Sequence, residues 1–330
     1  MAGADICFLA TSKSGLGHLR RVAAIARQTN KIAPNRRLHL VSNAKPEGIA
    51  PADLKVFDTI HLVDRARMAS DLPAVAGQAV LVLDTMAVPG IGRHGAPLAL
   101  VLREAPDNQL FRFRLGDGRP WDLAIIANPH AHWMPPYASL NACWTIAAGW
   151  IYRSAGTRRQ TGKGLPTVLV ATGGGGTAET AAFVHAQVDG LLAQVRHRAP
   201  PFVVVQAIGL RALAHGRLAA ADRVVDPGAE LESLFRDADV VISTAGYNSV
   251  LELATTDTPC LLVPIPRSID DQQARARLWA ARLGCWHDAT APRRSAEWLA
   301  CQIALCRRRP PVDLGPSGED RAARAILALG

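Results

Sequence analysis

Residues 239–254 read Asp-Val-Val-Ile-Ser-Thr-Ala-Gly-Tyr-Asn-Ser-Val-Leu-Glu-Leu-Ala, and they decide the fold of this chain. An apolar run leads into a glycine turn and a helix start, and a second apolar run ends at Val263. A polar loop, Pro264 to Gln273, follows. Continuous apolar strands separated by helices are typical of a parallel sheet covered on both faces. We therefore expect a strand, turn, helix, strand and loop that can together hold a phosphorylated ribose and a sugar.

The same alternation occurs in both halves of the chain. Helices are expected from about His18 to Thr29 and from Glu179 to Arg196, and a polar linker from Thr157 to Lys163. Strands are expected at Asp5 to Thr11, Leu38 to Ser42, Val80 to Leu83, Leu98 to Leu102, Leu123 to Ala127, Thr167 to Ala171, Phe202 to Gln206, Val240 to Ser243 and Cys260 to Val263. The pattern predicts an α/β protein of two similar domains with a cleft between them.

We predict three parts of the chain. Residues 1–156 form the first domain and residues 165–312 the second. Residues 313–330 contain a terminal helix that follows a proline-rich bend and crosses back toward the first domain. This length is comfortable for two domains, each of which can bury its own core.

Composition narrows the choice of partners. The net charge of +9 favours an anionic partner such as a nucleotide, a nucleic acid or an acidic membrane. Only 5% of the residues are aromatic, which argues against a base-stacking nucleic-acid surface. No signal peptide is expected, and the apolar runs are too short or too interrupted to span a bilayer. We expect a cytoplasmic protein, and no Cys/His spacing predicts a metal site.

The first glycine turn lies between a predicted strand and a predicted helix, where doubly wound sheets bind ligands. Gly15 and Gly17 would let another molecule approach the backbone closely. A nicotinamide site is disfavoured because Arg20 stands where a third glycine belongs. The second strand also ends in Leu-Val-Ser-Asn, without the acidic residue that would bind a ribose.

A histidine and an aspartate are the candidate catalytic residues. The helix dipole opposes protonation of His18 at its helix start, which favours a role as a base, while capping the helix is an equally good interpretation. Asp84, at the end of Val-Leu-Val-Leu-Asp, would orient the imidazole or act as a base itself. Its alternative role, as a cap or turn residue after the strand, is somewhat better supported by the sequence.

The candidate ligand-binding residues lie mostly in the second half. The run Gly173 to Gly176 favours a backbone nest for a phosphate or sugar, since ordering four glycines otherwise brings little benefit. Glu252 could accept the two ribose hydroxyls, or simply complement the helix dipole. The loop before Gln273 offers hydrogen bonds to a polyol, or is a solvated surface loop. The donor-binding candidates are Gly15, Gly17, Gly174, Gly175, Gly246, Asn248, Ser249, Glu252, Asp271, Gln272 and Gln273.

These motifs resemble those of a known family. Ser-Thr-Ala-Gly-Tyr-Asn-Ser-Val-Leu-Glu-Leu-Ala, Thr-Pro-Cys-Leu-Leu-Val-Pro and Asp-Asp-Gln-Gln are similar to the donor signature of GT-B glycosyltransferases, closest to the MurG type. The Gly-x-Gly-His-x-x-Arg turn resembles the PseG and SpsG group, which includes a UDP-sugar hydrolase. The resemblance implies two Rossmann-like domains, with the nucleotide sugar held mainly by the second and no required metal or cofactor.

The resemblance also implies roles for single residues. Glu252 would bind ribose, Gly246 and Ser249 would lie near the diphosphate together with Gly174 and Gly175, Gln272 and Gln273 would contact the sugar, and His18 would match the catalytic histidine of the hydrolase group. One departure is Ala276-Arg277, where transferases often carry Asn-Ala after the glutamine pair.

The sequence therefore predicts a metal-independent glycosyltransferase, a hexosyltransferase, with a donor that is UDP-linked and an acceptor hydroxyl that the residues do not identify. The alternatives are a UDP-sugar hydrolase of the PseG type and a non-catalytic nucleotide-sugar-binding protein. Nucleic acid is not expected as a partner. Peripheral contact with an anionic membrane at its inner face is compatible with the loop Pro129 to Tyr137, which would equally suit an acceptor-site lid.

Overall fold

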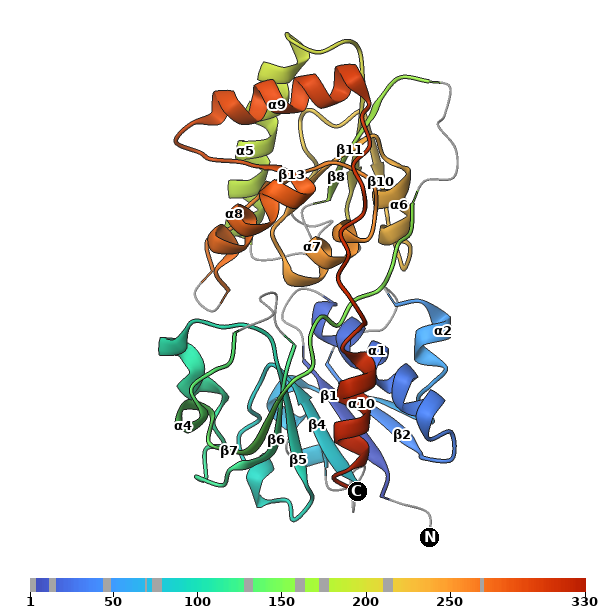
Figure 1. Ribbon diagram of the computed structural model, residues 1–330, viewed down its shortest axis with the longest axis vertical. Helices are drawn as coiled ribbons and strands as arrows, with labels where there is room; N and C mark the ends of the chain where they lie inside the picture. The colour runs from blue at the N-terminus through green and yellow to red at the C-terminus, as the bar shows by residue number, and fades with distance from the viewer. Residues whose placement is uncertain are drawn as a thin grey trace. The chain divides into compact units, whose positions relative to one another are not determined.

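The computed structural model describes residues 4–11, 16–43, 49–68, 70–72, 79–127, 133–157, 164–171, 178–209, 216–267 and 270–330. The chain divides into two compact units, coloured along the sequence in Figure 1. Unit 1 consists of Met1–Tyr152 together with Pro316–Gly330, and unit 2 of Arg153–Gly315. The cleft expected between the domains stays a prediction.

Unit 1 is built on a parallel sheet of seven strands in the order β3-β2-β1-β4-β5-β6-β7. The strands β1, β2, β4 and β5 are completely buried, because helices and loops cover both faces of the sheet centre. The strands are β1 Ile6–Ala10, β2 Leu38–Ser42, β3 Thr59–Leu62, β4 Val80–Asp84, β5 Leu98–Leu102, β6 Trp121–Ile126 and β7 Ala142–Ala147.

Two helices from opposite ends of the chain cover one face of this sheet. Helix α1, Gly17–Ile32, packs beside α10, Glu319–Leu327, as Figure 1 shows. Ala322 and Ile326 of α10 are buried in the same core as the strand residues Phe8 and Val82. The terminal helix is thus part of unit 1. The other helical elements of the unit are α2 Pro51–Leu54, η2 Arg65–Arg67, η3 Ile91–Arg93, η4 Asp107–Phe113 and α4 Tyr137–Leu140.

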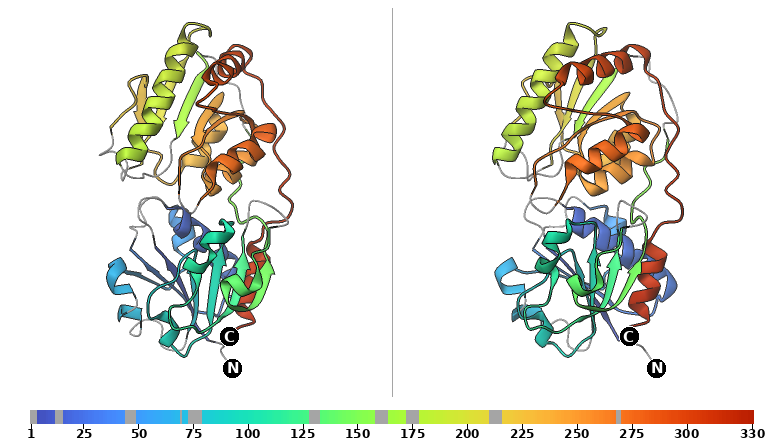
Figure 2. Two further views of the ribbon diagram at one scale, coloured as in Figure 1. Left: turned by 90° about the vertical axis from the view of Figure 1, so that its left-hand side faces the viewer. Right: turned by 60° about the vertical axis from the view of Figure 1, so that its left-hand side comes forward.

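Unit 2 repeats the architecture with a parallel sheet in the order β10-β9-β8-β11-β12-β13. Its strands are β8 Thr167–Ala171, β9 Val203–Ala207, β10 Arg223–Val225, β11 Val240–Thr244, β12 Cys260–Val263 and β13 Gly284–Trp286. Its helices are α5 Ala178–Arg196, α6 Leu231–Asp237, α7 Tyr247–Ala254, α8 Gln272–Leu283 and α9 Pro292–Leu305. Figure 2 shows α5 and α9 side by side, where they bury one face of the sheet.

The sequence predicted the central strands and missed the outer ones. Strands β3, β7, β10 and β13 each lie at an edge of a sheet. They are short or partly exposed: Leu62 of β3 and Trp144 of β7 are 55% and 68% exposed. Edge strands therefore lack the continuous apolar run by which the buried strands were recognised. The predicted linker lies largely outside the described residues.

Candidate functional site

The candidate catalytic residues meet at the switch point of the first sheet. Strand β1 pairs with β2 on one side and with β4 on the other, so the order in which strands are added to the sheet reverses between β1 and β4. Ligands of open α/β sheets bind at the carboxyl ends of the strands at such a point. His18 enters from the first turn of α1, and Asp84 is the last residue of β4.

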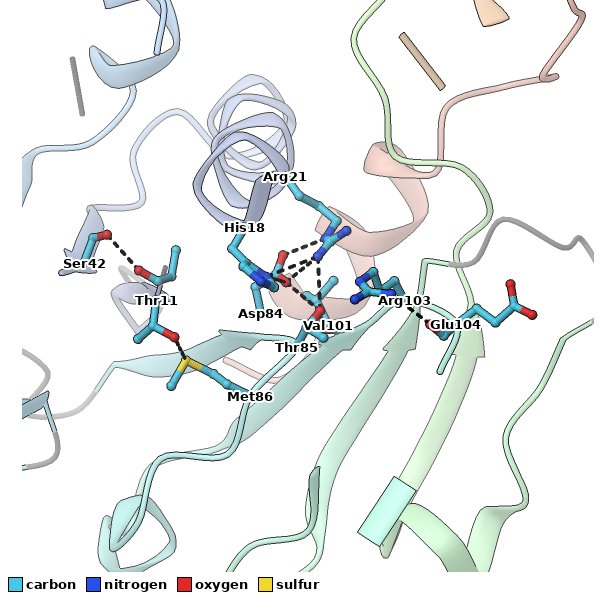
Figure 3. A network of polar contacts seen from close by, with 11 residues as sticks. Thr11, His18, Arg21, Ser42, Asp84, Thr85, Met86, Val101, Arg103 and Glu104 are labelled. Atoms are coloured by element: carbon cyan, nitrogen blue, oxygen red, sulfur yellow. Dashed lines mark hydrogen bonds and ion pairs between the residues drawn. The ribbon is translucent and has the colours of Figure 1, made fainter. Parts of the chain in front are cut away.

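Figure 3 shows that these two side chains are in direct contact. His18 Nδ1 lies 2.9 Å from Asp84 Oδ1. The Asp84 side chain is completely buried, while that of His18 is 32% exposed. The predicted pairing of the two residues is therefore present in the fold, although its role in a reaction stays a prediction.

An arginine and a threonine complete the site, and no role for either was predicted from the sequence. Arg21 donates from Nε to Asp84 Oδ2 at 2.7 Å and from Nη2 to Asp84 Oδ1 at 2.6 Å. Thr85 donates to Asp84 Oδ1 at 2.8 Å and accepts from Arg21 at 3.1 Å. The spacing of His18 and Arg21, three residues apart, places both on one helix face and was the available signal.

This network determines the charge of the carboxyl. Burial on its own would raise the pKa of Asp84, but the Arg21 guanidinium and the hydrogen bonds from His18 and Arg21 outweigh burial and hold that pKa below its ordinary value. An ionised carboxylate can only accept hydrogen bonds, so Nδ1 of His18 carries the proton. In the neutral tautomer that this contact selects, Nε2 holds the free electron pair. The geometry favours orientation of His18 by Asp84 over direct base chemistry by Asp84.

The backbone at this point is held in an uncommon conformation. Thr85 has φ 49°, in the left-handed region that β-branched residues rarely adopt. Its amide donates to Val101 O of the neighbouring strand at 2.7 Å, which fixes the peptide directly after Asp84. Such strain persists where the surroundings over-determine it, and it is frequent at functional sites.

The donor-binding candidates that the structure describes in unit 2 lie after β11 and β12 of the second sheet. Strand β11 pairs in parallel with β8 on one side and with β12 on the other, so Gly246 and the loop described from Pro264 follow two neighbouring strands. Gly15, Gly174 and Gly175 lie outside the described residues. Gly17 is the first residue of α1.

Gly246 occupies the N-cap of α7 and provides no side-chain cap. Its φ of −66° is open to any residue. A Cβ built there would lie 3.9 Å from the Ser249 and Thr244 hydroxyls, an ordinary contact. Neither the backbone nor packing explains this glycine, and the close approach of a ligand would. Asn248 and Ser249, both partly buried, occupy the first turn of α7.

Glu252 lies deeper in the helix than the dipole interpretation requires. It is the sixth residue of α7, and no acidic residue occupies the first turn. The influence of the helix dipole is confined to the first and last turns, so the alternative of dipole compensation is wrong for this residue. The Glu252 side chain is buried within unit 2.

The three polar residues at the start of α8 differ in their surroundings. Asp271 caps the helix and accepts from the Ala274 amide at 2.9 Å. Gln272 is buried and uses both ends of its amide: Oε1 accepts from Ile265 N at 3.2 Å, and Nε2 donates to Asp270 at 3.3 Å. Gln273 is partly buried, and its side chain makes no hydrogen bond within the described part of the chain.

The loop predicted for membrane contact, Pro129 to Tyr137, is described from Trp133 onward. Met134, in the predicted loop, is 46% exposed, and residues 128–132 lie outside the described part. No helix among the described residues is long and apolar enough to cross a bilayer. Peripheral contact with a membrane stays a prediction.

Two doubly wound parallel domains, each with candidate residues at its switch point, define the class of protein as GT-B. Comparison with solved structures agrees. The alignment with MurG of Acinetobacter baumannii covers 98% of this chain and 99% of that chain, with a TM-score of 0.54 and 13% sequence identity. The alignment with the putative UDP-N-acetylglucosamine 2-epimerase of Listeria monocytogenes covers 99% of this chain and 96% of that chain, with a TM-score of 0.60 and 11% sequence identity. At these identities the likeness shows the fold alone.

Sequence comparison reaches further for the second half. Residues 168–311 match the glycosyltransferase family 28 C-terminal domain. The UDP-N-acetylglucosamine--N-acetylmuramyl-(pentapeptide) pyrophosphoryl-undecaprenol N-acetylglucosamine transferase of Aromatoleum aromaticum is 30% identical over 180 residues, which are 52% of this chain and 49% of that protein. The chain thus spans about half the length of this relative.

The predicted fold and the predicted resemblance to MurG-type proteins are confirmed. The family match agrees with the predicted enzyme class, a glycosyltransferase, for the half of the chain that it covers. The resemblance of the first glycine turn to the PseG and SpsG group stays a prediction.

Proposed function

We propose that this chain is a glycosyltransferase that moves a hexose from a UDP-sugar to an acceptor hydroxyl, with His18 as the general base. The observation that carries the proposal is the buried Asp84 carboxylate bound to Nδ1 of a partly exposed His18. The match of residues 168–311 to the glycosyltransferase family 28 C-terminal domain supports this class of reaction.

In the proposed reaction, Nε2 of His18 takes the proton of the acceptor hydroxyl. The oxygen of that hydroxyl forms a bond to the anomeric carbon of the sugar, and the bond from this carbon to the diphosphate breaks. The imidazolium that forms is stabilised by Asp84, which Arg21 and Thr85 hold in place. General base catalysis of this kind contributes about 10²- to 10⁴-fold in rate.

The leaving UDP carries the electron pair of the broken bond, and the proposal places its diphosphate at the start of α7. The first amides of a helix have no partner within the helix and favour an anion. Gly246 would let the diphosphate approach, and Glu252 would accept the ribose hydroxyls. Donors of this kind can stabilise a leaving group without a metal ion. UDP-N-acetylglucosamine is the first donor to test, because it is part of the names of the sequence relatives.

The test is turnover of a UDP-sugar by the full chain. UDP release from UDP-N-acetylglucosamine and other UDP-hexoses is measured with a panel of acceptor alcohols. His18→Ala is expected to lower kcat by about 10²-fold or more while UDP affinity changes little. Asp84→Asn should lower kcat with melting temperature recorded alongside, because the amide selects the wrong tautomer of His18.

Three results would contradict the proposal. Stoichiometric release of free sugar without any acceptor would identify a hydrolase. Saturable UDP binding without product, with or without acceptors, would identify a binding protein. Unchanged turnover in His18→Ala would remove this residue from the mechanism.

A further inference from the structure

A buried arginine lies beside the proposed donor site. Arg275, on the first turn of α8, is only 4% exposed. Taking a guanidinium out of water is costly unless its donors are paired. The partners of Arg275 therefore decide what it contributes.

The guanidinium joins two segments that are far apart in the sequence. Nη1 donates to Ala245 O at 2.9 Å, and Nη2 pairs with Asp270 Oδ1 at 2.7 Å. Ala245 directly precedes Gly246, while Asp270 belongs to the loop that leads into the glutamine pair. One side chain thus connects the turn before α7 with the loop before α8.

The connection continues through that loop. Asp270 Oδ2 accepts from Gln272 Nε2, and Gln272 Oε1 accepts from the Ile265 amide. A chain of hydrogen bonds therefore runs from the end of β11 to the residues just after β12. It leaves Gln273, next in sequence, as the glutamine without an internal partner among the described residues.

The third nitrogen of the guanidinium, Nε, indicates that Arg275 is not placed there for stability. Arg275 Nε is buried and has no partner among the described residues. A buried donor without a partner lowers stability, and apolar residues often replace buried ion pairs without loss of stability. Geometry explains the arginine better, because its planar fork can hold two acceptors at a fixed separation and lysine cannot.

We propose that Arg275 is a positioning residue that sets the separation between the start of α7 and Gln273. The inference rests on the proposed function, in which the start of α7 binds the diphosphate, and on the expected contact of Gln273 with the sugar. UDP alone needs only the α7 side. A UDP-sugar needs both sides at the correct separation, so Arg275 contributes to recognition of the sugar and not of the nucleotide.

The test compares UDP with UDP-N-acetylglucosamine on the full chain by calorimetry. Arg275→Lys and Arg275→Met are expected to raise the Kd for the UDP-sugar by about tenfold or more and the Kd for UDP by less than about threefold. The KM for the donor should rise with it. Arg309→Lys is the matched control, because Arg309 also binds backbone carbonyls, Leu253 O and Thr258 O, at the other end of α7. It should lower the melting temperature without selective loss of the UDP-sugar.

Equal weakening of UDP and UDP-sugar by the Arg275 variants, in step with their melting temperatures, would overturn the inference, as would unchanged Kd values for both. A UDP-sugar that binds no better than UDP to the unaltered chain would overturn it as well. If the unaltered chain binds neither ligand, the proposed function fails first, and the inference fails with it.

Discussion

At the scale of single residues, the glutamine pair separates structure from recognition. The Gln272 side-chain amide is bonded at both ends, whereas the Gln273 side chain has no hydrogen bond within the described residues. Gln272→Ala should therefore lower the free energy of unfolding by about 1–3 kcal/mol, because it leaves the buried Ile265 amide unpaired. Gln273→Ala should change that free energy by less than about 0.5 kcal/mol.

For binding of the UDP-sugar, we expect Gln273 to contribute directly and Gln272 only through the structure of the loop. Gln273→Ala is expected to weaken the UDP-sugar and leave UDP unchanged, with its melting temperature preserved. Chemical denaturation and calorimetry on both variants measure the two effects. A stable Gln272→Ala that loses the UDP-sugar, beside a Gln273→Ala that keeps it, would reverse the assignment.

The residues also show what a sequence can reveal about a site. His18 and Asp84 were predictable because each follows or ends an apolar run, and parallel strands bring such ends to one edge. The bonds of Arg21 to Asp84 depend on how deeply α1 packs against β4, which no local pattern records. Thr85 carried no signal, since its backbone conformation is imposed by β5 through Val101.

At the scale of elements, the packing of α10 on α1 contains a pH-sensitive contact. Glu319, at the start of α10, lies 3.7 Å from Arg27 of α1, which also pairs with Asp53 of α2 at 2.6 Å. Burial raises the pKa of Glu319 from its ordinary 4.5 to about 7, Asp53 adds to the rise, and Arg27 opposes it. The folded chain thus binds more protons than the unfolded chain between these pH values.

The sign of the effect follows from this difference. Stability from Glu319 is fully present below pH 4.5 and is lost as the pH rises to about 7. Glu319→Gln should therefore flatten the dependence between pH 5 and 8 and stabilise unit 1 at pH 8, on the order of 2 kcal/mol. Melting temperatures across that range measure it.

The neighbouring carboxylate gives a matched control. Asp320 pairs with Arg324 and Gln28, and these bonds lower its pKa from the ordinary value. Asp320→Asn should leave the slope between pH 5 and 8 as it is in the unaltered chain. The explanation fails if Glu319→Gln keeps the full slope, or if Asp320→Asn removes it.

At the scale of the whole molecule, the order of apolar runs was enough to predict two doubly wound domains. Both sheets have the strand order 3-2-1-4-5-6 in their own numbering, with one further strand in the first. Central strands are predictable because burial on both faces demands apolar residues. The pairing of edge strands such as β3 and β13 depends on neighbours distant in sequence. The packing of the last fifteen residues in unit 1 likewise depends on contacts between segments that are distant in sequence.

The packing of the terminal helix in unit 1 contributes to the stability of that unit. Unit 1 includes Pro316–Gly330, and Ala322 and Ile326 fill its core against α1. Ending the chain after Gly315 removes these side chains and exposes the apolar face of α1. Each large buried side chain lost from a core costs about 2–5 kcal/mol. We expect truncation to lower the melting transition of unit 1 strongly while unit 2 melts as before.

Differential scanning calorimetry distinguishes the two transitions, and UDP assigns them under the proposed function, because a ligand of unit 2 raises only the transition of that unit. Ile326→Ala in the full-length chain tests the same contact with less disturbance and should shift the same transition by a smaller amount. Arg324→Ala is its control, since this side chain is 66% exposed on the same helix. Truncation that lowered the UDP-responsive transition instead, or neither, would mean that α10 does not stabilise unit 1 in solution.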